Sequence, residues 1–301
     1  MEKVRDQAAT LDYLKILVRA YYDIQGQRER SEHRLKYVKN PIDVEFLQDL
    51  IVRRCKKQEK DLKKEIERTL EEFPVWTEYL SKIRGYGPIL AGGEIAETYP
   101  ISRFDSPSKL WAYHGVSVGY VLVRCTRSSK AHRFIMTSMP DYTCPRKLKG
   151  GNDICGEKFE LIEEHPTEIP RRMAGYGCNW NTFLQTHVFR TGSCFRRDRS
   201  NGFYKQLYFK IKDEYKLKKP SPSNASKKQL ERWHSHINQM ALRKTVKIFL
   251  QHYWVVARIL DGLPTGKPYI IEHGGHANYI PPMIDTDEGP IEWEATKEFS
   301  N

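Results

Sequence analysis

Four cysteines lie in one stretch of the chain that has little helical or strand periodicity. They are Cys144, Cys155, Cys178 and Cys194. Proline follows the first and glycine the second, and both residues favour turns that direct backbone N–H groups at a thiolate sulfur. Because four thiolates are enough for a tetrahedral site, the four cysteines are the predicted ligands of a structural Zn²⁺ ion. No Cys-x-x-Cys pair occurs, so free buried thiols or disulfides remain the alternatives.

A glycine-rich turn is the first candidate for contact with nucleic acid. A short helix should end near residue 83, and Pro88 suits the first turn of the next helix, where its missing N–H costs nothing. The resulting helix-hairpin-helix directs backbone N–H groups outward, where they can hold a phosphate oxygen without reading base sequence. An ordinary tight turn between two helices is the alternative. The residues expected to contact nucleic acid here are Lys82, Arg84, Gly85, Tyr86 and Gly87.

Positive charge is concentrated in residues 186–250. This stretch holds sixteen lysines and arginines against four acidic residues, an excess of twelve that equals the net charge of +12 of the whole chain. Aromatic residues are interleaved with the charge, which suits phosphate contacts combined with stacking, although a solvated lysine-rich face is the alternative. Further cations expected to contact nucleic acid, in this stretch and before it, are Arg103, Arg124, Arg127, Lys130, Arg196, Arg197 and Lys205.

The elements that must position these residues are mainly α-helical. Apolar residues recur at helical spacing over 2–37 and 42–73, which predicts a long helical hairpin or part of a coiled coil. β-Branched residues make 116–136 the best candidate for strands. A buried core helix is expected over 227–260, ended by Gly262 and Pro264. The predicted fold is therefore mainly α with a small β or irregular cysteine-rich insert.

Residues 96–116 carry the most diagnostic pattern. They read AETYPISRFDSPSKLWAYHGV and directly follow the glycine-rich turn. This stretch resembles the C-terminal half of the insertion sequence 110 (also called 116/902) transposase family, in which a glycine-rich hairpin precedes an acidic alanine helix, an Arg-Phe-x-Ser step and an aromatic-x-Gly ending. The resemblance covers roughly residues 45–135 and 195–265 and is strongest over 78–116. It implies a DNA-binding or DNA-recombining role.

Two departures from that family limit what the resemblance implies. The family begins with a RuvC-like nuclease domain carrying four metal-binding acids, but here the N-terminal part is helical and has no apolar run ending in Asp-x-Ser or Asp-x-Thr. The family also has a serine nucleophile beside a glycine after the aromatic-x-Gly step. Ser128 and Ser129 are nearest to that place, and no glycine adjoins them. We interpret them as surface hydroxyls near a phosphate, with a nucleophilic role as the alternative.

Five segments are expected along the chain. They are a helical hairpin (1–73), a helix-hairpin-helix domain (74–137), the cysteine-rich insert (138–195), a basic helical segment (196–265) and an acidic tail (266–301). No apolar run approaches the roughly 18 residues of a membrane span, and the first residues are too polar for a signal peptide. The sequence thus predicts a cytoplasmic, nucleoid-associated protein that does not enter a membrane.

The preferred function is non-catalytic binding of the DNA backbone by a transposase-derived protein that forms a homo-oligomer. Duplex or branched DNA is the expected partner, and structured RNA stays open. One alternative is a recombinase or transposase subunit with a serine nucleophile, the only case in which Mg²⁺ is expected. The second alternative is a structural protein that packages nucleic acid or assembles into larger particles.

Overall fold

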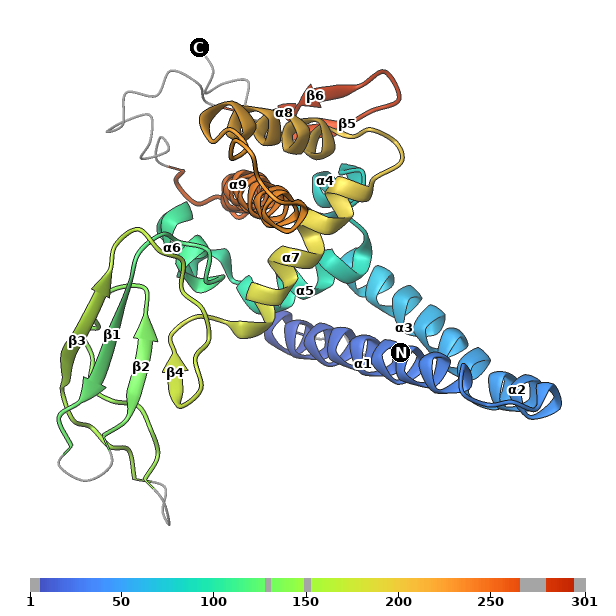
Figure 1. Cartoon of the computed structure of the whole chain (residues 1–301), viewed down its shortest axis with the longest axis horizontal. Coiled ribbons are helices and arrows are strands. Elements are labelled where there is room, and N and C mark those ends of the chain that lie inside the picture. The colour runs from blue at the N-terminus through green and yellow to red at the C-terminus, as the bar shows by residue number, and fades with distance from the viewer. Residues whose placement is uncertain (1–5, 128–130, 149–152, 266–279, 295–301) are drawn as a thin grey trace. The chain divides into compact units, whose positions relative to one another are not determined.

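The computed structural model describes residues 6–127, 131–148, 153–265 and 280–294. This part of the chain is mainly helical, as the sequence predicted, with a four-stranded sheet and a two-stranded hairpin (Figure 1). The chain divides into two compact units, each assembled from separate stretches. Unit 1 comprises Met1–Arg103, Ser193–Lys210 and Val255–Asn301, and unit 2 comprises Phe104–Gly192 and Ile211–Trp254. None of the described helices combines the length and the apolar character that crossing a bilayer requires.

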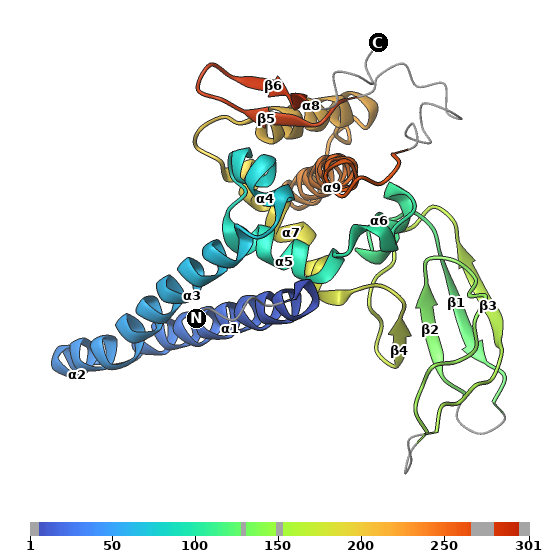
Figure 2. The same cartoon turned by 180° about the vertical axis from the view of Figure 1, so that it is seen from behind.

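Unit 1 begins with the predicted helical hairpin (Figure 2). Its first arm is α1 (Gln7–Leu35). The return arm consists of α2 (Pro41–Leu47), a π-helix (Gln48–Arg53) and α3 (Arg54–Leu70). The Tyr13 hydroxyl donates to Glu65 at 2.8 Å and Arg28 Nε donates to Glu59 at 2.6 Å, as expected for antiparallel arms. The π-helical segment was not predicted, because apolar spacing does not distinguish one wide turn from regular helix.

The hairpin packs on α5 (Pro88–Thr98), which is buried along nearly its whole length. Contact is closest at Gly92. A Cβ atom there would lie 3.0 Å from Ile66 Cγ2 and 3.1 Å from Val18 Cγ2. Since interiors are close-packed, a side chain at this position would push the three helices apart. Glycine therefore lets α1 and α3 meet α5.

The glycine-rich turn joins two short helical segments to a helix that begins at Pro88, as predicted. α4 (Pro74–Glu78) and a 3-10 turn (Leu80–Lys82) precede it. Gly85 then adopts φ +79°, a conformation that disfavours residues with a side chain. Gly87 is the N-cap of α5 and Pro88 occupies its first turn. A second 3-10 turn, Ile101–Arg103, ends this part of unit 1.

Three long helices follow later in the chain, and each contains a boundary between the units. They are α7 (Thr182–Arg197), α8 (Phe203–Lys218) and α9 (Lys227–Leu260). The α9 bounds match the prediction, and Gly262 at φ +65° ends the helix as expected. By contrast, α7 lies largely inside the stretch expected to be β or irregular. Asn181 begins it by accepting the backbone N–H of Phe183 at 3.0 Å.

Unit 2 contains α6 (Pro107–Tyr113), whose N-cap Ser106 accepts the Lys109 N–H, and a four-stranded sheet. The strands are β1 (Tyr120–Cys125), β2 (Arg133–Met136), β3 (Phe159–His165) and β4 (Tyr176–Cys178). Their order is β3-β1-β2-β4, with β1 antiparallel to both neighbours and β4 parallel to β2 (Figure 1). In unit 1, the described part of the expected acidic tail forms a hairpin of β5 (Met283–Asp285) and β6 (Pro290–Glu292).

Candidate metal centre and basic groove

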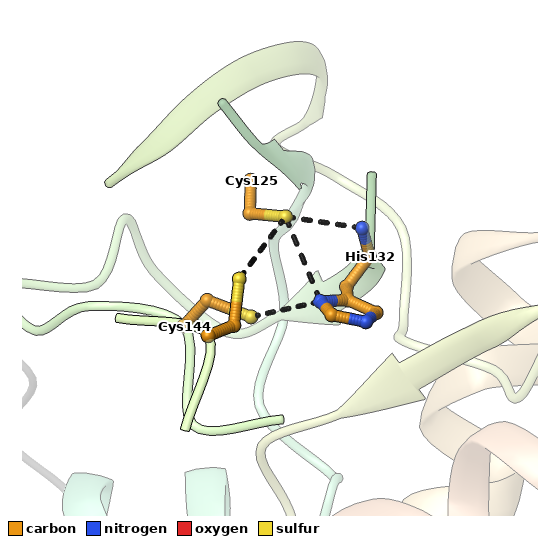
Figure 3. Close-up of side chains that lie close together, drawn as sticks. Cys125, His132 and Cys144 are labelled. Carbon is orange, nitrogen blue, oxygen red and sulfur yellow. Dashed lines mark hydrogen bonds between the residues drawn. The ribbon is translucent and has the colours of Figure 1, made fainter. Parts of the chain in front are cut away.

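Three cysteines and one histidine converge at one end of the sheet in unit 2 (Figure 3). Their ligand atoms all lie within 4.8 Å of one another, in the group Cys125, His132, Cys144 and Cys155, of which Figure 3 labels the first three. His132 Nδ1 is 3.4 Å from Cys144 Sγ and 3.7 Å from Cys125 Sγ. A tetrahedral Zn²⁺ site with one nitrogen and three sulfur ligands has edges of roughly 3.5–3.8 Å. The group therefore fits a metal ion of that geometry.

The local backbone explains why these side chains meet. Cys125 is the last residue of β1 and His132 directly precedes β2, so the antiparallel pairing of these strands brings the two together. In the loop that follows, the Cys144 N–H donates to Glu157 O at 2.8 Å, and the Gly156 N–H donates back to Cys144 O at 3.1 Å. Gly156 adopts φ +66° beside Cys155. The turn residues thus perform the predicted task of shaping the backbone around the sulfur atoms.

Burial and hydrogen bonding act in opposite directions on the thiols. Burial raises the pKa of Cys144 to about 11. Burial also opposes ionisation of Cys155, but the backbone N–H of Glu157 and the neighbouring thiols lower the pKa of that group. Cys125 and Cys144 belong to the small apolar core on this face of the sheet, together with Phe134. A bound cation would stabilise the thiolates inside this core.

The predicted ligand set was half right. Cys144 and Cys155 belong to the group, but Cys178 and Cys194 do not. Cys178 is in β4, where its thiol hydrogen-bonds Trp180 O at 3.7 Å, and Cys194 is exposed on α7. Sequence reasoning missed Cys125 because it lies inside a predicted strand. The signal that could have found it is the Cys-x6-His spacing across a predicted β-turn-β unit.

The structure brings the glycine-rich turn against the junction of α7 and α8 in unit 1. A Cβ atom on Gly85 would lie 3.3 Å from Cys194 O and 3.2 Å from Asp198 Cβ. The buried Tyr86 ring lies 6.0 Å from that of Phe195. Two parts of the predicted nucleic-acid contact are therefore adjacent. The predicted cations carried by this junction are Arg196, Arg197 and Lys205.

A carboxylate from another part of unit 1 already accepts a backbone N–H group of this turn. The Asp285 carboxylate accepts the backbone N–H of Arg84 at 2.9 Å and that of Phe203 at 2.8 Å. The Arg84 guanidinium donates to Ser200 O at 3.3 Å and pairs with Asp287 at 3.3 Å. A backbone N–H that was expected to hold a phosphate oxygen is thus bonded to a carboxylate of the β5–β6 hairpin.

Other predicted cations of unit 1 also have partners within the protein. Lys82 pairs with Glu78 at 3.7 Å. The Lys205 ammonium donates to the backbone oxygen of Asp198 at 2.7 Å. Arg103 donates to a backbone carbonyl of α5 at 3.4 Å. Such contacts are compatible with phosphate binding, but they leave these groups less available than free surface cations.

The predicted residues around the serines are only partly described. In unit 2, Arg124 pairs across the sheet with Glu160. Arg127 hydrogen-bonds the Cys155 thiol and so belongs to the surroundings of the metal centre. Three residues lie outside the described part of the chain, namely Ser128, Ser129 and Lys130.

A groove of about 1110 Å³ in unit 2 gathers cations that the sequence did not single out. The loop between β3 and β4, together with α7 and α9, forms most of its wall. Its cations are Arg171, Arg172, Lys219, Arg232 and Arg243. One carboxylate, that of Glu168, also lines the groove, and it is bonded to the Tyr120 hydroxyl at 3.3 Å. We call this surface the basic groove.

The five cations of the basic groove have no carboxylate partner among the described residues. Arg243 is half-buried, and burial together with the nearby charge of Arg171 lowers the pKa of its guanidinium. One turn further along α9, burial and the charge of Arg243 lower the pKa of Lys247. Positive groups are therefore held close together at an energetic cost that a bound anion would reduce.

A helical pattern could have revealed part of the basic groove. Arg232, His236 and Arg243 are separated by four and seven residues, so they share one face of α9. The Arg171-Arg172 pair lies in a segment without periodicity and can be placed only by the fold.

The chain matches no protein-family model and no curated protein sequence.

Proposed function

We propose that this protein binds nucleic acid through the phosphate backbone and does so without catalysing strand cleavage. The observation that carries the proposal is the basic groove, in which five unpaired cations face one engaged carboxylate within the described residues. Phosphodiester chains are the polyanions that such a surface matches best, because each phosphate contact releases a condensed counterion. Arginine, which supplies four of the five cations, binds phosphate oxygens in a bidentate manner.

The glycine-rich turn has a secondary part in this proposal. Its glycines are exposed, so a phosphate can approach the start of α5. However, Asp285 already accepts the Arg84 N–H, so the turn offers fewer free donors than its sequence suggests. The basic groove therefore supplies the main electrostatic attraction, and the turn adds contacts that do not depend on base sequence.

The resemblance of the sequence to the helix-hairpin-helix half of the insertion sequence 110 transposases supports the same proposal. It rests on the pattern over 78–116 and on the turn and capped helix that those residues form. On this account the chain keeps the DNA-holding part of such a protein. The competing proposal is a recombinase that uses Ser128 or Ser129, and covalent protein–DNA adducts formed in the presence of Mg²⁺ would favour it.

We further propose that the Cys125, His132, Cys144 and Cys155 group holds a structural Zn²⁺ ion. Three thiolates and one imidazole form a closed tetrahedral set, which is typical of structural zinc and leaves no open position for catalysis. The small core on this face of the sheet is built around two of the ligands. Zinc would therefore stabilise the sheet whose β3–β4 loop forms one wall of the basic groove.

A salt titration tests the proposed function. If five phosphates are contacted, the affinity for a labelled oligonucleotide should fall roughly 100- to 500-fold between ~50 and ~200 mM salt. Fluorescence anisotropy with several unrelated sequences provides the measurement, and similar affinities are expected because backbone contacts carry no sequence information. No binding to any single-stranded, duplex or branched nucleic acid at ~50 mM salt would exclude the proposal.

A further inference from the structure

We infer that the basic groove binds a single-stranded segment, with phosphates on its arginines and at least one unpaired base on Phe189. This inference rests on the proposed function and specifies its ligand. The shared chemistry is a phosphodiester chain with accessible base faces, as single-stranded DNA and RNA both provide. All residues that line the groove belong to unit 2.

Exposed apolar side chains inside the basic groove point to unpaired bases. Phe189 is 52% exposed and Met173 is 45% exposed, although both line the groove. A duplex hides its base faces by stacking, so it would leave these side chains against a hydrated backbone. A single strand can place a base on the aromatic ring while its phosphates contact cations, which is the usual arrangement in single-strand-binding grooves.

The size of the basic groove favours a chain over a single nucleotide. Its volume of about 1110 Å³ is above the range of roughly 300–1,000 Å³ that is typical of small-molecule sites. Its cations come from separate elements: the β3–β4 loop carries Arg171, the end of α8 leads to Lys219, and α9 carries Arg232 and Arg243. Cations distributed in this way suit successive phosphates.

The basic groove is held in shape by hydrogen bonds that need no ligand. The Gln185 side chain donates to Pro170 O at 3.2 Å and accepts the Trp180 indole N–H at 3.0 Å. The Gly119 N–H donates to Glu168 O at 2.8 Å, which joins the first part of the same loop to the residue before β1. Because the wall is fixed in advance, a bound strand would lose little free energy to ordering of the protein.

Three labelled probes of equal length test this inference: oligo-dT, oligo-U and a mixed-sequence duplex. The variants are Phe189→Ala and its control Phe46→Ala, which removes a ring that is at least as exposed (64%) from the helical hairpin. We expect both single strands to bind more tightly than the duplex. Phe189→Ala should weaken single-strand binding roughly 5- to 100-fold, with little effect on the duplex. Phe46→Ala should change none of the three affinities.

The outcomes separate this inference from the proposed function. If oligo-dT binds more tightly than oligo-U, single-stranded DNA is the preferred ligand; if oligo-U binds more tightly, single-stranded RNA is preferred. Either result supports the inference. If the duplex binds at least as tightly as the single strands and Phe189→Ala has no effect, the inference is wrong and the proposed function stands. If none of the three probes binds, the proposed function itself is wrong.

Discussion

Asp285 of β5 and Arg84 of the glycine-rich turn are joined by a 2.9 Å hydrogen bond from the backbone N–H of Arg84 to the carboxylate. The same carboxylate accepts the N–H of Phe203, the first residue of α8. A single acidic side chain thus links two segments more than a hundred residues apart in the sequence. It also lies where the turn was expected to receive a phosphate oxygen.

The first prediction concerns this carboxylate. Asp285→Ala leaves two backbone N–H groups without their charged acceptor, and each such bond contributes about 1.5–3 kcal/mol. We therefore expect the free energy of unfolding to fall by roughly 3–6 kcal/mol in urea denaturation. Asp287→Ala is the matched control, because Asp287 is fully exposed, and it should change stability by less than about 0.5 kcal/mol. Equal effects of the two substitutions would show that the Asp285 bonds do not stabilise unit 1.

The second prediction concerns the metal centre. Protein purified without added metal should contain about one Zn²⁺ per chain, measured by inductively coupled plasma mass spectrometry. Cys125→Ser and Cys144→Ser should each bring the zinc content below half an equivalent, because three ligands hold structural zinc poorly. Cys194→Ser should retain the full content, since this exposed cysteine is not in the group.

Two results would contradict the zinc assignment. One is less than half an equivalent of zinc in the unmodified protein. The other is loss of zinc in Cys194→Ser with retention in Cys125→Ser, which would favour the ligand set expected from the sequence. Removing zinc with a chelator should also reduce the resistance of residues 120–178 to proteolysis, since the sheet would lose the ion that its small core surrounds.

The third prediction concerns helix packing in unit 1. Gly92→Ala should destabilise the protein by about 1–3 kcal/mol, because the added methyl group would meet Ile66 and Val18 at 3.0 and 3.1 Å. Gly26→Ala is the matched change, since its methyl group would meet only the flexible end of Arg30 within α1. For Gly26→Ala we expect the free energy of unfolding to rise by about 0.5–1 kcal/mol, because alanine has the higher helix propensity. A melting temperature that falls in Gly92→Ala and rises in Gly26→Ala would support the close contact at Gly92. An unchanged melting temperature in Gly92→Ala would contradict it.

Local signals in the sequence predicted much of the fold. The bounds of α9, the cap at Ser106 and the turn at Gly85 and Pro88 each depend on a few neighbouring residues, so they could be identified without tertiary information. The π-helical segment and α7 were not predicted. The first differs from regular helix by hydrogen bonding alone. The second lies at the end of the cysteine-rich segment, where turn-forming residues obscured the helical spacing of Leu184, Val188 and Phe195.

The candidate sites were less predictable, because they depend on strand pairing and loop placement. Cys125 and His132 meet only when β1 pairs with β2, so a ligand set chosen by cysteine density contained Cys178 in place of Cys125. The basic groove combines Arg171 of an irregular loop with Arg243 of α9, a separation that no sequence pattern spans. Charge density suggested a polyanionic ligand, but it did not indicate which surface gathers the cations.

The most direct test of the account compares two double substitutions that remove the same charge. Arg171→Gln with Arg243→Gln neutralises two cations of the basic groove, and Arg53→Gln with Arg68→Gln neutralises two exposed arginines of the helical hairpin. Thermal denaturation should first show that both variants are folded. The measurement is the salt dependence of oligonucleotide affinity.

The groove variant should bind at least about tenfold more weakly at ~100 mM salt, and the slope of log affinity against log salt concentration should be smaller by roughly 2. The hairpin variant should retain the slope of the unmodified protein. Identical losses in the two variants would show that binding follows net charge alone. That result would contradict the assignment of nucleic-acid binding to the basic groove.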